Sequence, residues 1–284
     1  QRLQRRGRSG RLAKRAATPA IDPCPPGQVG GVYRPLNEAD LRRIYDTAMD
    51  LLEKLGIGEV PERLQKDLMA IGARDNGAGR FVFPPALVEE AIDQAAKPYT
   101  LHGRDPARSI EVGGNKVYFG TGGAAVQTLD LPTQQYRAST LAELHDFTRL
   151  QDTVANVSWY TRCCVATDVP NNFDLDVNTV FALLKNTTKP TATSFTLADY
   201  VEPIVGMLDI AAGGPGEFAK RPFMKAHISP MISPMRYGED AVDVLYECIR
   251  HNIPISCITA AQAGATAPAT LAGFLAQSLA ETLA

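Results

Sequence analysis

The sequence predicts an α/β protein built around a parallel sheet, and the regular spacing of its second half is the main reason. Short runs rich in β-branched and apolar residues begin near Val157, Thr191, Phe223 and Ile255, roughly every 32 residues, which is the length of one strand-plus-helix unit. A loop rich in Ser, Thr, Pro or Gly follows each run, and a helical pattern follows each loop. This alternation predicts a parallel sheet that is either doubly wound or closed into a (β/α)8 barrel.

The repeat stops after four units. The fourth unit ends with the helical pattern of residues 271–284, where the given sequence also ends. Four units resemble half of a barrel, so we expect residues 138–284 to form the first units of an incomplete TIM-type barrel. Taken alone, such a half leaves one sheet edge unpaired and apolar helix faces uncovered, and we expect it to aggregate or to be inactive.

The composition is that of a soluble globular enzyme, with 45% apolar and 21% charged residues among 284. No apolar run reaches the ~18 residues that a membrane span needs. No secretory signal pattern follows the first residue, Gln1. The five cysteines are an odd number without a Cys-x-x-Cys motif, which favours free thiols in a reducing cytoplasm. The vicinal pair Cys163-Cys164 is interpreted as structural rather than metal-binding.

Residues 1–16 form a basic arm that contains seven Arg and Lys residues and no acid. The whole chain has 29 basic and 31 acidic residues and a net charge of −2. When the seven basic residues of the arm are left out, 22 basic and 31 acidic residues remain, so the rest of the chain has a net charge of −9. An acidic body argues against a nucleic-acid groove, and no aromatic residue stands among the arginines to stack on bases. We interpret residues 1–30, which are basic and then rich in Pro and Gly, as a disordered tail.

Residues 31–137 predict a helical and β-rich preface to the barrel. Helices are predicted for three segments with clear start or stop signals, namely 38–55 between the N-cap Asn37 and Gly56, 61–71 before Gly72, and 84–97 between two prolines. A short strand is predicted at 81–83. Residues 117–130 predict two strands around a glycine turn. Thr140 and Glu143 form a capping box, so another helix is predicted over roughly 140–153.

Candidate binding residues lie in the loops that follow the four regular strands, because barrels build their active sites there. These loops are polar but nearly uncharged, and Asp168 is the one acid close to a strand end. That composition differs from the paired carboxylates of a glycosidase. It suits a substrate held by hydroxyls, amides and aromatic faces, and Trp159, Tyr160 and Phe195 are available to stack on a cation.

Two other kinds of site are not supported by the sequence. The segment Gly120-Thr-Gly-Gly123 follows a strand, but the helix that a dinucleotide-binding fingerprint requires does not follow it. A close backbone approach is the better interpretation of these glycines. No pair of histidines has metal-ligand spacing, and we expect no bound metal. Among the histidines, only His227 lies near the end of a predicted barrel strand.

Several segments resemble the trimethylamine:corrinoid methyltransferase family, which includes pyrrolysine-containing members and quaternary-amine members without pyrrolysine. The matching segments are Leu101-His-Gly-Arg-Asp-Pro106, Phe119-Gly-Thr-Gly-Gly123, Ile228-Ser-Pro-Met231 followed by Asp240, and residues 263–273, Ala-Gly-Ala-Thr-Ala-Pro-Ala-Thr-Leu-Ala-Gly. The last is the most specific, because its Gly/Thr/Pro pattern opens a helix directly after a barrel strand. The Arg-rich start also resembles the family's N-terminus.

The resemblance implies a full (β/α)8 barrel that moves a methyl group from trimethylamine, or from a quaternary amine such as glycine betaine, to the cobalt of a separate corrinoid protein. It implies that the barrel itself binds no cofactor and that the corrinoid is carried by a cognate partner. We expect the full-length protein to be a cytoplasmic homo-oligomer. For this activity we assign substrate binding to eight residues at the strand ends and catalysis to none: Tyr160 and Asp168 for the ammonium group, and Ser194, Thr196, His227, Ser229, Gln262 and Thr266 for the pocket lining.

Two alternatives stay open on the sequence alone. The chain also fits an unrelated TIM-barrel enzyme, such as a lyase or a pterin-dependent methyltransferase, which would bind a divalent metal or a pterin. It also fits an inactive truncated fragment. Where the family uses pyrrolysine, that residue lies in the second half of the barrel, so residues 1–284 do not name the amine.

Overall fold

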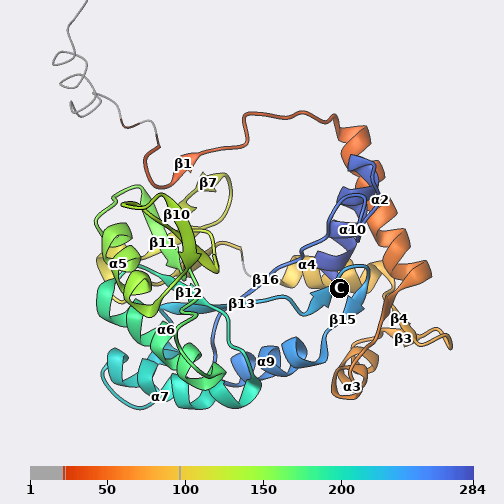
Figure 1. The fold of residues 1–284 in the computed structure, drawn as a ribbon. Coiled ribbons are helices and arrows are strands. Elements are labelled where there is room, and N and C mark those ends of the chain that lie inside the picture. Colours follow the sequence, from red (N-terminus) through yellow and green to blue (C-terminus); the bar gives the residue numbers. More distant parts are fainter. Residues whose placement is uncertain (1–21, 23, 96) are drawn as a thin grey trace, which may run out of the picture.

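The computed structural model describes residues 22, 24–95 and 97–284, which form two bodies of mixed α/β structure (Figure 1). One of them, the sheet body, contains a parallel sheet and the helices that cover it. The other, the helical body, combines helices from the start of the described chain with the helix that precedes the C-terminus. The basic arm of residues 1–16 lies outside the described residues.

Five parallel strands form the centre of the sheet body. They are β8 (Phe119–Gly120), β11 (Val157–Thr161), β12 (Thr191–Thr193), β13 (Met224–Ile228) and β16 (Ile255–Cys257). They lie side by side in chain order, and every neighbouring pair is parallel. A doubly wound sheet would reverse its strand order at a switch point, so this order is consistent with part of a barrel. The four strand starts predicted from the sequence are confirmed.

The first strand of this sheet lies before residue 138, where the sequence predicts the barrel units to begin. Two strands flank the glycines of residues 117–130, as predicted, but they do not pair with each other. β8 joins the parallel sheet, whereas β9 (Gln127–Asp130) pairs antiparallel with β10 (Gln135–Ala138). The backbone of Gly120 and Gly123 lies directly against β11 and the residues after it, an approach that a side chain would block.

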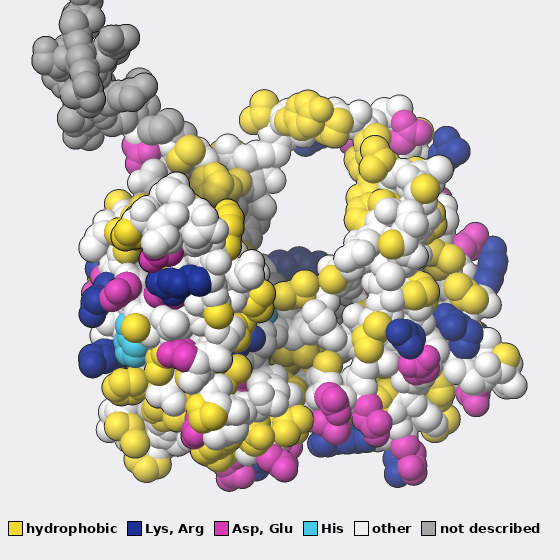
Figure 2. Space-filling model, viewed as in Figure 1, with side chains coloured by type: hydrophobic (Ala, Val, Ile, Leu, Met, Phe, Trp, Pro, Cys, Tyr) yellow, Lys and Arg dark blue, Asp and Glu magenta, His cyan; other side chains and the backbone are white. Residues whose placement is uncertain are grey.

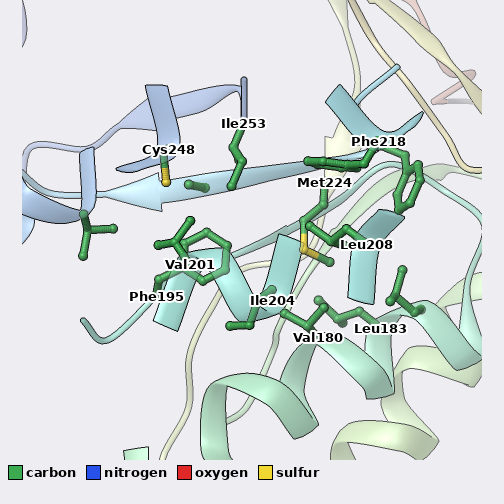
Figure 3. Close-up of a cluster of buried hydrophobic side chains, with 14 of the residues drawn as sticks. Val180, Leu183, Phe195, Val201, Ile204, Leu208, Phe218, Met224, Cys248 and Ile253 are labelled. Atoms are coloured by element: carbon green, nitrogen blue, oxygen red, sulfur yellow. The ribbon is translucent and has the colours of Figure 1, made fainter. Parts of the chain in front are cut away.

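Helices packed on the sheet bury the largest apolar cluster of the sheet body. They are α6 (Asn172–Asn186), the 3-10 turn η3 (Ala198–Tyr200), α7 (Val201–Ala212), α8 (Glu217–Lys220) and α9 (Glu239–Arg250), whereas α5 (Leu141–Asp152) packs on α6 over a smaller cluster around Leu144. The capping box at the start of α5 is confirmed. Leu208, Phe218 and Met224 are completely buried in this cluster (Figure 3). Burial of one such side chain contributes about 1.5–3 kcal/mol to stability.

The helical body is built from segments far apart in the sequence. Its elements are α2 (Glu38–Asp50) continued by the π-helical turn η1 (Leu51–Leu55), β2 (Ile57–Gly58), α3 (Glu62–Ala70), β3 (Arg74–Asp75), β4 (Arg80–Val82), α4 (Pro85–Gln94), β14 (Met231–Ile232), β15 (Arg236–Tyr237) and α10 (Leu271–Leu283). The predicted N-terminal helices and the strand near residue 81 are confirmed. The small sheet has the order β14-β15-β2-β4-β3, so the loop after β13 enters a sheet that the N-terminal segment began.

The helix of the fourth predicted unit does not cover the parallel sheet. Instead, α10 packs against α2 in the helical body, where Ala280 is fully buried. The buried carboxylate of Glu281 holds it there. This carboxylate accepts hydrogen bonds from Ser233 Oγ (2.6 Å), Met235 N (3.0 Å) and Gln277 Nε2 (2.8 Å). The small side chains and the buried anchor therefore direct α10 away from the sheet.

Short strand pairs complete the described chain. β5 (Tyr99–Leu101) pairs with β6 (Ile110–Val112) around the 3-10 turn η2 (Pro106–Arg108), and β1 (Gln28–Val29) pairs with β7 (Lys116–Val117). β1 lies in the segment for which the sequence predicts a disordered tail. After β1 the chain spans an open space between the two bodies, which Figure 2 shows. None of the helices in the described part of the chain is both long and apolar enough to cross a membrane.

Replacement of Glu281 by Ala is expected to destabilise the protein by about 3 kcal/mol, because it leaves the buried N–H of Met235 and two side chains without their acceptor. Urea unfolding followed by circular dichroism measures this loss. The matched control is Glu202→Ala, which removes an exposed ion pair with Arg250 and should cost less than about 1 kcal/mol. Equal losses in both variants would show that Glu281 does not anchor α10.

Candidate functional site

A pocket of about 320 Å³ lies at the carboxyl edge of the parallel sheet, where α/β proteins bind their ligands. The loops after β12 and β13, the first turn of α9 and the residue after β16 form its walls. The lining residues are Ser194, Phe195, Thr196, His227, Ile228, Ser229, Asp240, Ala241, Val244 and Ile258. Its volume is at the lower end of the range for small-molecule sites, ~300–1,000 Å³.

Four of the eight residues assigned from the sequence line this one pocket. They are Ser194, Thr196, His227 and Ser229. They come together because parallel strands in chain order deliver their carboxyl ends to the same edge. Asp240, which belongs to one of the segments quoted for the family resemblance, adds an exposed carboxylate to the wall.

The other four assigned residues do not line this pocket. The side chain of Tyr160 lies in the buried apolar cluster of the sheet body, and its hydroxyl contacts Cys163 Sγ at 3.1 Å. Asp168 accepts a hydrogen bond from the backbone N–H of Leu141 (2.8 Å), which caps the start of α5. Gln262 and Thr266 bond to each other within one loop. These four substrate contacts stay predictions.

Alternation along β11 explains why Tyr160 and its neighbour Trp159 differ, since successive strand residues point to opposite faces. Tyr160 faces the covering helices, and Trp159 faces the opposite, inner side of the sheet. The ring centroid of Trp159 lies 5.9 Å from that of His227, edge to face, and 4.4 Å from Lys225 Nζ. Lys225 Nζ also donates to Ser256 Oγ at 3.0 Å. An aromatic ring, an ammonium and an imidazole therefore share the inner face.

Positive charge gathers around His227. Burial lowers the pKa of its imidazole to about 4, and Lys225 and then Arg162 lower this pKa further by repelling a proton. Burial likewise lowers the pKa of Lys225. Burial also lowers the pKa of Arg162, a shift that Asp176 opposes. The imidazole of His227 is therefore neutral at pH 7.

Asp176 is a buried carboxylate behind the pocket wall, with 1% of its surface exposed. It accepts hydrogen bonds from the backbone N–H of Thr196 (2.6 Å) and from the Thr196 hydroxyl (2.9 Å). Burial raises the pKa of Asp176, and these hydrogen bonds oppose the rise. Asp176 thus fixes the loop after β12, and it commits the Thr196 hydroxyl to a structural bond.

The structure also shows what the glycines at 120–123 do. A side-chain carbon on Gly120 would lie 2.0 Å from Trp159 Cε2, and one on Gly123 would lie 2.8 Å from the carbonyl oxygen of Arg162. The expected close backbone approach is confirmed. Sequence reasoning did not assign Asp240 to the site, although it belongs to a segment that resembles the family. Lys225 lines a different pocket, together with Trp159.

A larger pocket of about 610 Å³ lies at the opposite edge of the sheet, next to Val157 at the start of β11. The Arg108–Asp152 ion pair and Lys189 line it. Lys189 Nζ donates to the carbonyl oxygens of Gln151 and Val154. In barrels this edge contributes to stability rather than to catalysis, so the smaller pocket at the carboxyl edge is the candidate site.

The vicinal cysteines do not form a disulfide, and all five cysteines are free. A hydrogen bond from Cys164 lowers the pKa of Cys163 to about 7, and the same contact raises the pKa of Cys164. Cys164 is buried against α5. Within the described ranges, no group of three His, Cys, Asp or Glu side chains is arranged to hold a metal ion.

The model of the trimethylamine methyltransferase (MTTB) family matches residues 4–284. The chain belongs to this family. Among curated proteins it is 27% identical to the trimethylamine methyltransferase MttB of Desulfitobacterium hafniense, over 87% of this chain and 50% of the relative. It is 25% identical to the glycine betaine methyltransferase of another strain of that species, over 91% of this chain and 53% of the relative. It shares 25% identity with the trimethylamine methyltransferase MttB of Methanosarcina barkeri, over 86% of this chain and 50% of the relative.

The chain therefore spans about half the length of the curated relatives that it matches. Family membership confirms the resemblance inferred from the residues, and it leaves an unrelated barrel enzyme without support. The family members matched here are methyltransferases by name. Their names divide between a tertiary and a quaternary amine, so the family alone does not choose between these substrates.

Replacement of Gly120 by Ala is expected to displace the ring of Trp159 and to cost about 1–3 kcal/mol of stability. Trp159 is the single tryptophan of the 284 residues, so intrinsic fluorescence reports its displacement as a shift to longer wavelength. The control Gly206→Ala adds a methyl group where no atom lies within 4 Å, inside α7, and should leave emission unchanged. Unchanged emission in the Gly120 variant would contradict the close packing.

The imidazole of His227 is expected to titrate near pH 4 in the folded protein, against an ordinary value of 6.5. Because the unfolded chain takes up this proton first, His227 makes the folded state lose stability as the pH falls from about 6.5 to about 4. NMR of the imidazole measures the midpoint. Lys225→Met removes one neighbouring charge and should raise it; an unchanged midpoint would show that Lys225 does not act on His227.

Proposed function

We propose that the full-length protein transfers a methyl group from trimethylamine, or from a quaternary amine such as glycine betaine, to the cobalt of a cognate corrinoid protein. The match of the trimethylamine methyltransferase family over residues 4–284 carries this proposal. We further propose that the parallel sheet is part of a complete (β/α)8 barrel, that the corrinoid is carried by the partner, and that the protein is a cytoplasmic homo-oligomer.

Such a transfer requires few covalent steps from residues of the barrel itself. The reduced corrinoid supplies an electron pair that forms the new bond to the methyl carbon. The carbon–nitrogen bond breaks, and its electron pair stays on nitrogen. A quaternary ammonium therefore leaves as a neutral tertiary amine, and trimethylamine must react as its protonated ammonium to leave as neutral dimethylamine. The protein must hold the methyl group in line with the incoming nucleophile and keep water away.

The pocket at the carboxyl edge suits that task. Its walls combine the hydroxyls of Ser194 and Ser229 with the apolar side chains of Phe195, Val244 and Ile258. This mixture can surround methyl groups while a few polar groups fix the orientation. The Asp240 carboxylate at the wall offers an attraction for the ammonium group. The four predicted residues that line the pocket, with Asp240, are thus the substrate contacts we propose.

Full-length protein that is mixed with reduced cognate corrinoid protein and trimethylamine or glycine betaine is expected to convert the corrinoid to its methylated form, which absorbance spectroscopy measures. Ser194→Leu fills the pocket and should lower the rate at least about tenfold, because displacement of the methyl group by 1 Å costs up to 100-fold. Thr100→Leu adds similar bulk at an exposed strand position and serves as the control.

Two outcomes would overturn the proposal. The first is that no methylamine methylates the corrinoid, although the full-length protein is folded and the partner is reduced. The second is that Ser194→Leu and Thr100→Leu have equal rates, which would place the reaction away from the pocket at the carboxyl edge.

A further inference from the structure

A carboxylate occupies an apolar position of α6. The buried face of this helix includes Val180 and Leu183, which pack in the cluster that covers the sheet, and Asp176 lies on the same face at helical spacing. Only 1% of its surface is exposed. Burial there disfavours the charged form and raises the pKa of Asp176. A valine or leucine would fill this position without that cost, so the carboxylate indicates a role other than filling the core.

Both oxygens of this carboxylate bind one residue of the pocket wall. Oδ2 of Asp176 accepts a hydrogen bond from the backbone N–H of Thr196 at 2.6 Å, and Oδ1 accepts one from the Thr196 hydroxyl at 2.9 Å. Thr196 itself is exposed and lines the pocket at the carboxyl edge. Hydrogen bonds to an ionised acceptor are about twice as strong as neutral ones. The two bonds therefore hold both the backbone and the side chain of Thr196.

The rest of the loop after β12 is held as well. The side chain of Phe195 is buried in the apolar cluster of the sheet body. On the other side of Ser194, the hydroxyl of Thr193 donates to the carbonyl oxygen of Ser194 at 3.3 Å. Ser194 and Thr196 therefore line the pocket from a backbone that is fixed at both ends. A loop fixed in this way keeps its ligand contacts in one geometry.

We infer that Asp176 is a positioning residue of the proposed methyl transfer, and that it acts through Thr196 to hold the loop of residues 194–196 in the geometry that aligns the methyl group of the substrate. Asp176 touches no substrate itself, because it is buried behind the pocket wall. The inference rests on the proposed function and deepens it by adding a residue outside the pocket. The single hydrogen that the Thr196 side chain can donate is used by Asp176, so Thr196 offers a ligand only acceptor and apolar contacts.

The test replaces Asp176 by Asn, which keeps the volume of the side chain but removes its charge and one of its acceptor oxygens. In the full-length protein with reduced cognate corrinoid protein, Asp176→Asn is expected to lower kcat for trimethylamine or glycine betaine at least about tenfold, because displacement of the methyl group by about 1 Å costs up to about 100-fold. The corrinoid protein concentration that gives half-maximal rate should stay unchanged. Isothermal titration should show at least about threefold weaker binding of the amine, the effect of one lost hydrogen bond.

Asp209→Asn is the matched control. The Asp209 carboxylate also holds a loop, since it accepts hydrogen bonds from the backbone N–H groups of Gly216 (2.8 Å) and Phe218 (3.0 Å). That loop leads into the start of β13, at the amino edge of the sheet and away from the pocket. The melting temperature should fall in both variants, whereas only Asp176→Asn should change the rate and the binding of the amine. Rates are compared below both melting temperatures.

Two substitutions of the exposed Thr196 test whether Asp176 acts through it. Thr196→Ser keeps the hydroxyl donor and Thr196→Val keeps the bulk, so the Ser variant should transfer methyl groups faster than the Val variant. A role of bulk alone would reverse this order. Because Asp176→Asn and Thr196→Val disrupt the same contact, the double variant should be no more than about twofold slower than Asp176→Asn alone.

Equal rates of Asp176→Asn and Asp209→Asn, a Ser variant slower than the Val variant, or losses that multiply in the double variant would each overturn the inference. A loss that appears only as a higher requirement for the corrinoid protein would also overturn it, because the carboxylate would then serve the partner. Absence of transfer from any amine by the unsubstituted full-length protein would overturn the proposed function instead. Binding of the amine would then decide by itself whether Asp176 positions the pocket loop.

Discussion

The parallel pairing of β8, β11, β12, β13 and β16 in chain order is the constraint on which the rest of the structure depends. Parallel neighbours require a long crossover, and right-handed crossovers place their helices on the same face of the sheet. That face is closed by a buried apolar cluster. The opposite face is then the only one on which charged side chains such as Lys225 can meet, and all carboxyl ends share one edge.

This geometry places two kinds of side chain around the candidate site. The edge supplies short polar side chains from loops, of which Ser194 and Ser229 are examples, and these tolerate a small ligand with methyl groups. The inner face supplies longer side chains from the strands, which meet because strand neighbours stand at matching heights; His227 and Ser256 pair in this way across β13 and β16.

The helical body shows that the helices of the regular strand-plus-helix units do not all pack on the parallel sheet. The helix after β16 follows the same sequence rhythm as α6, α7 and α9, yet it packs on α2. The loop after β13 behaves similarly, since β14 and β15 extend a sheet that begins with β2, β3 and β4. Segments far apart in sequence therefore pack against each other, and the curated relatives are about twice as long as this chain.

The sequence by itself determined most of the helices, the regular strands of the parallel sheet and the family. Local signals suffice for these, because caps, glycine stops and the period of strand-plus-helix units act over a few residues; Asn37, Gly56 and the Thr140 capping box are where predicted. The sequence also indicated the pocket, since strand ends at regular intervals must share an edge.

Only the tertiary structure decided which face each strand residue occupies and which loop residues reach the pocket. Tyr160 faces the core because the strand pleat points it toward the helices, and Asp168 is used to cap α5. Trp159 and Lys225 come together across β11 and β13, although they are far apart in sequence. Neither pleat phase nor long-range register follows from local patterns, because both are set by the packing of the whole sheet.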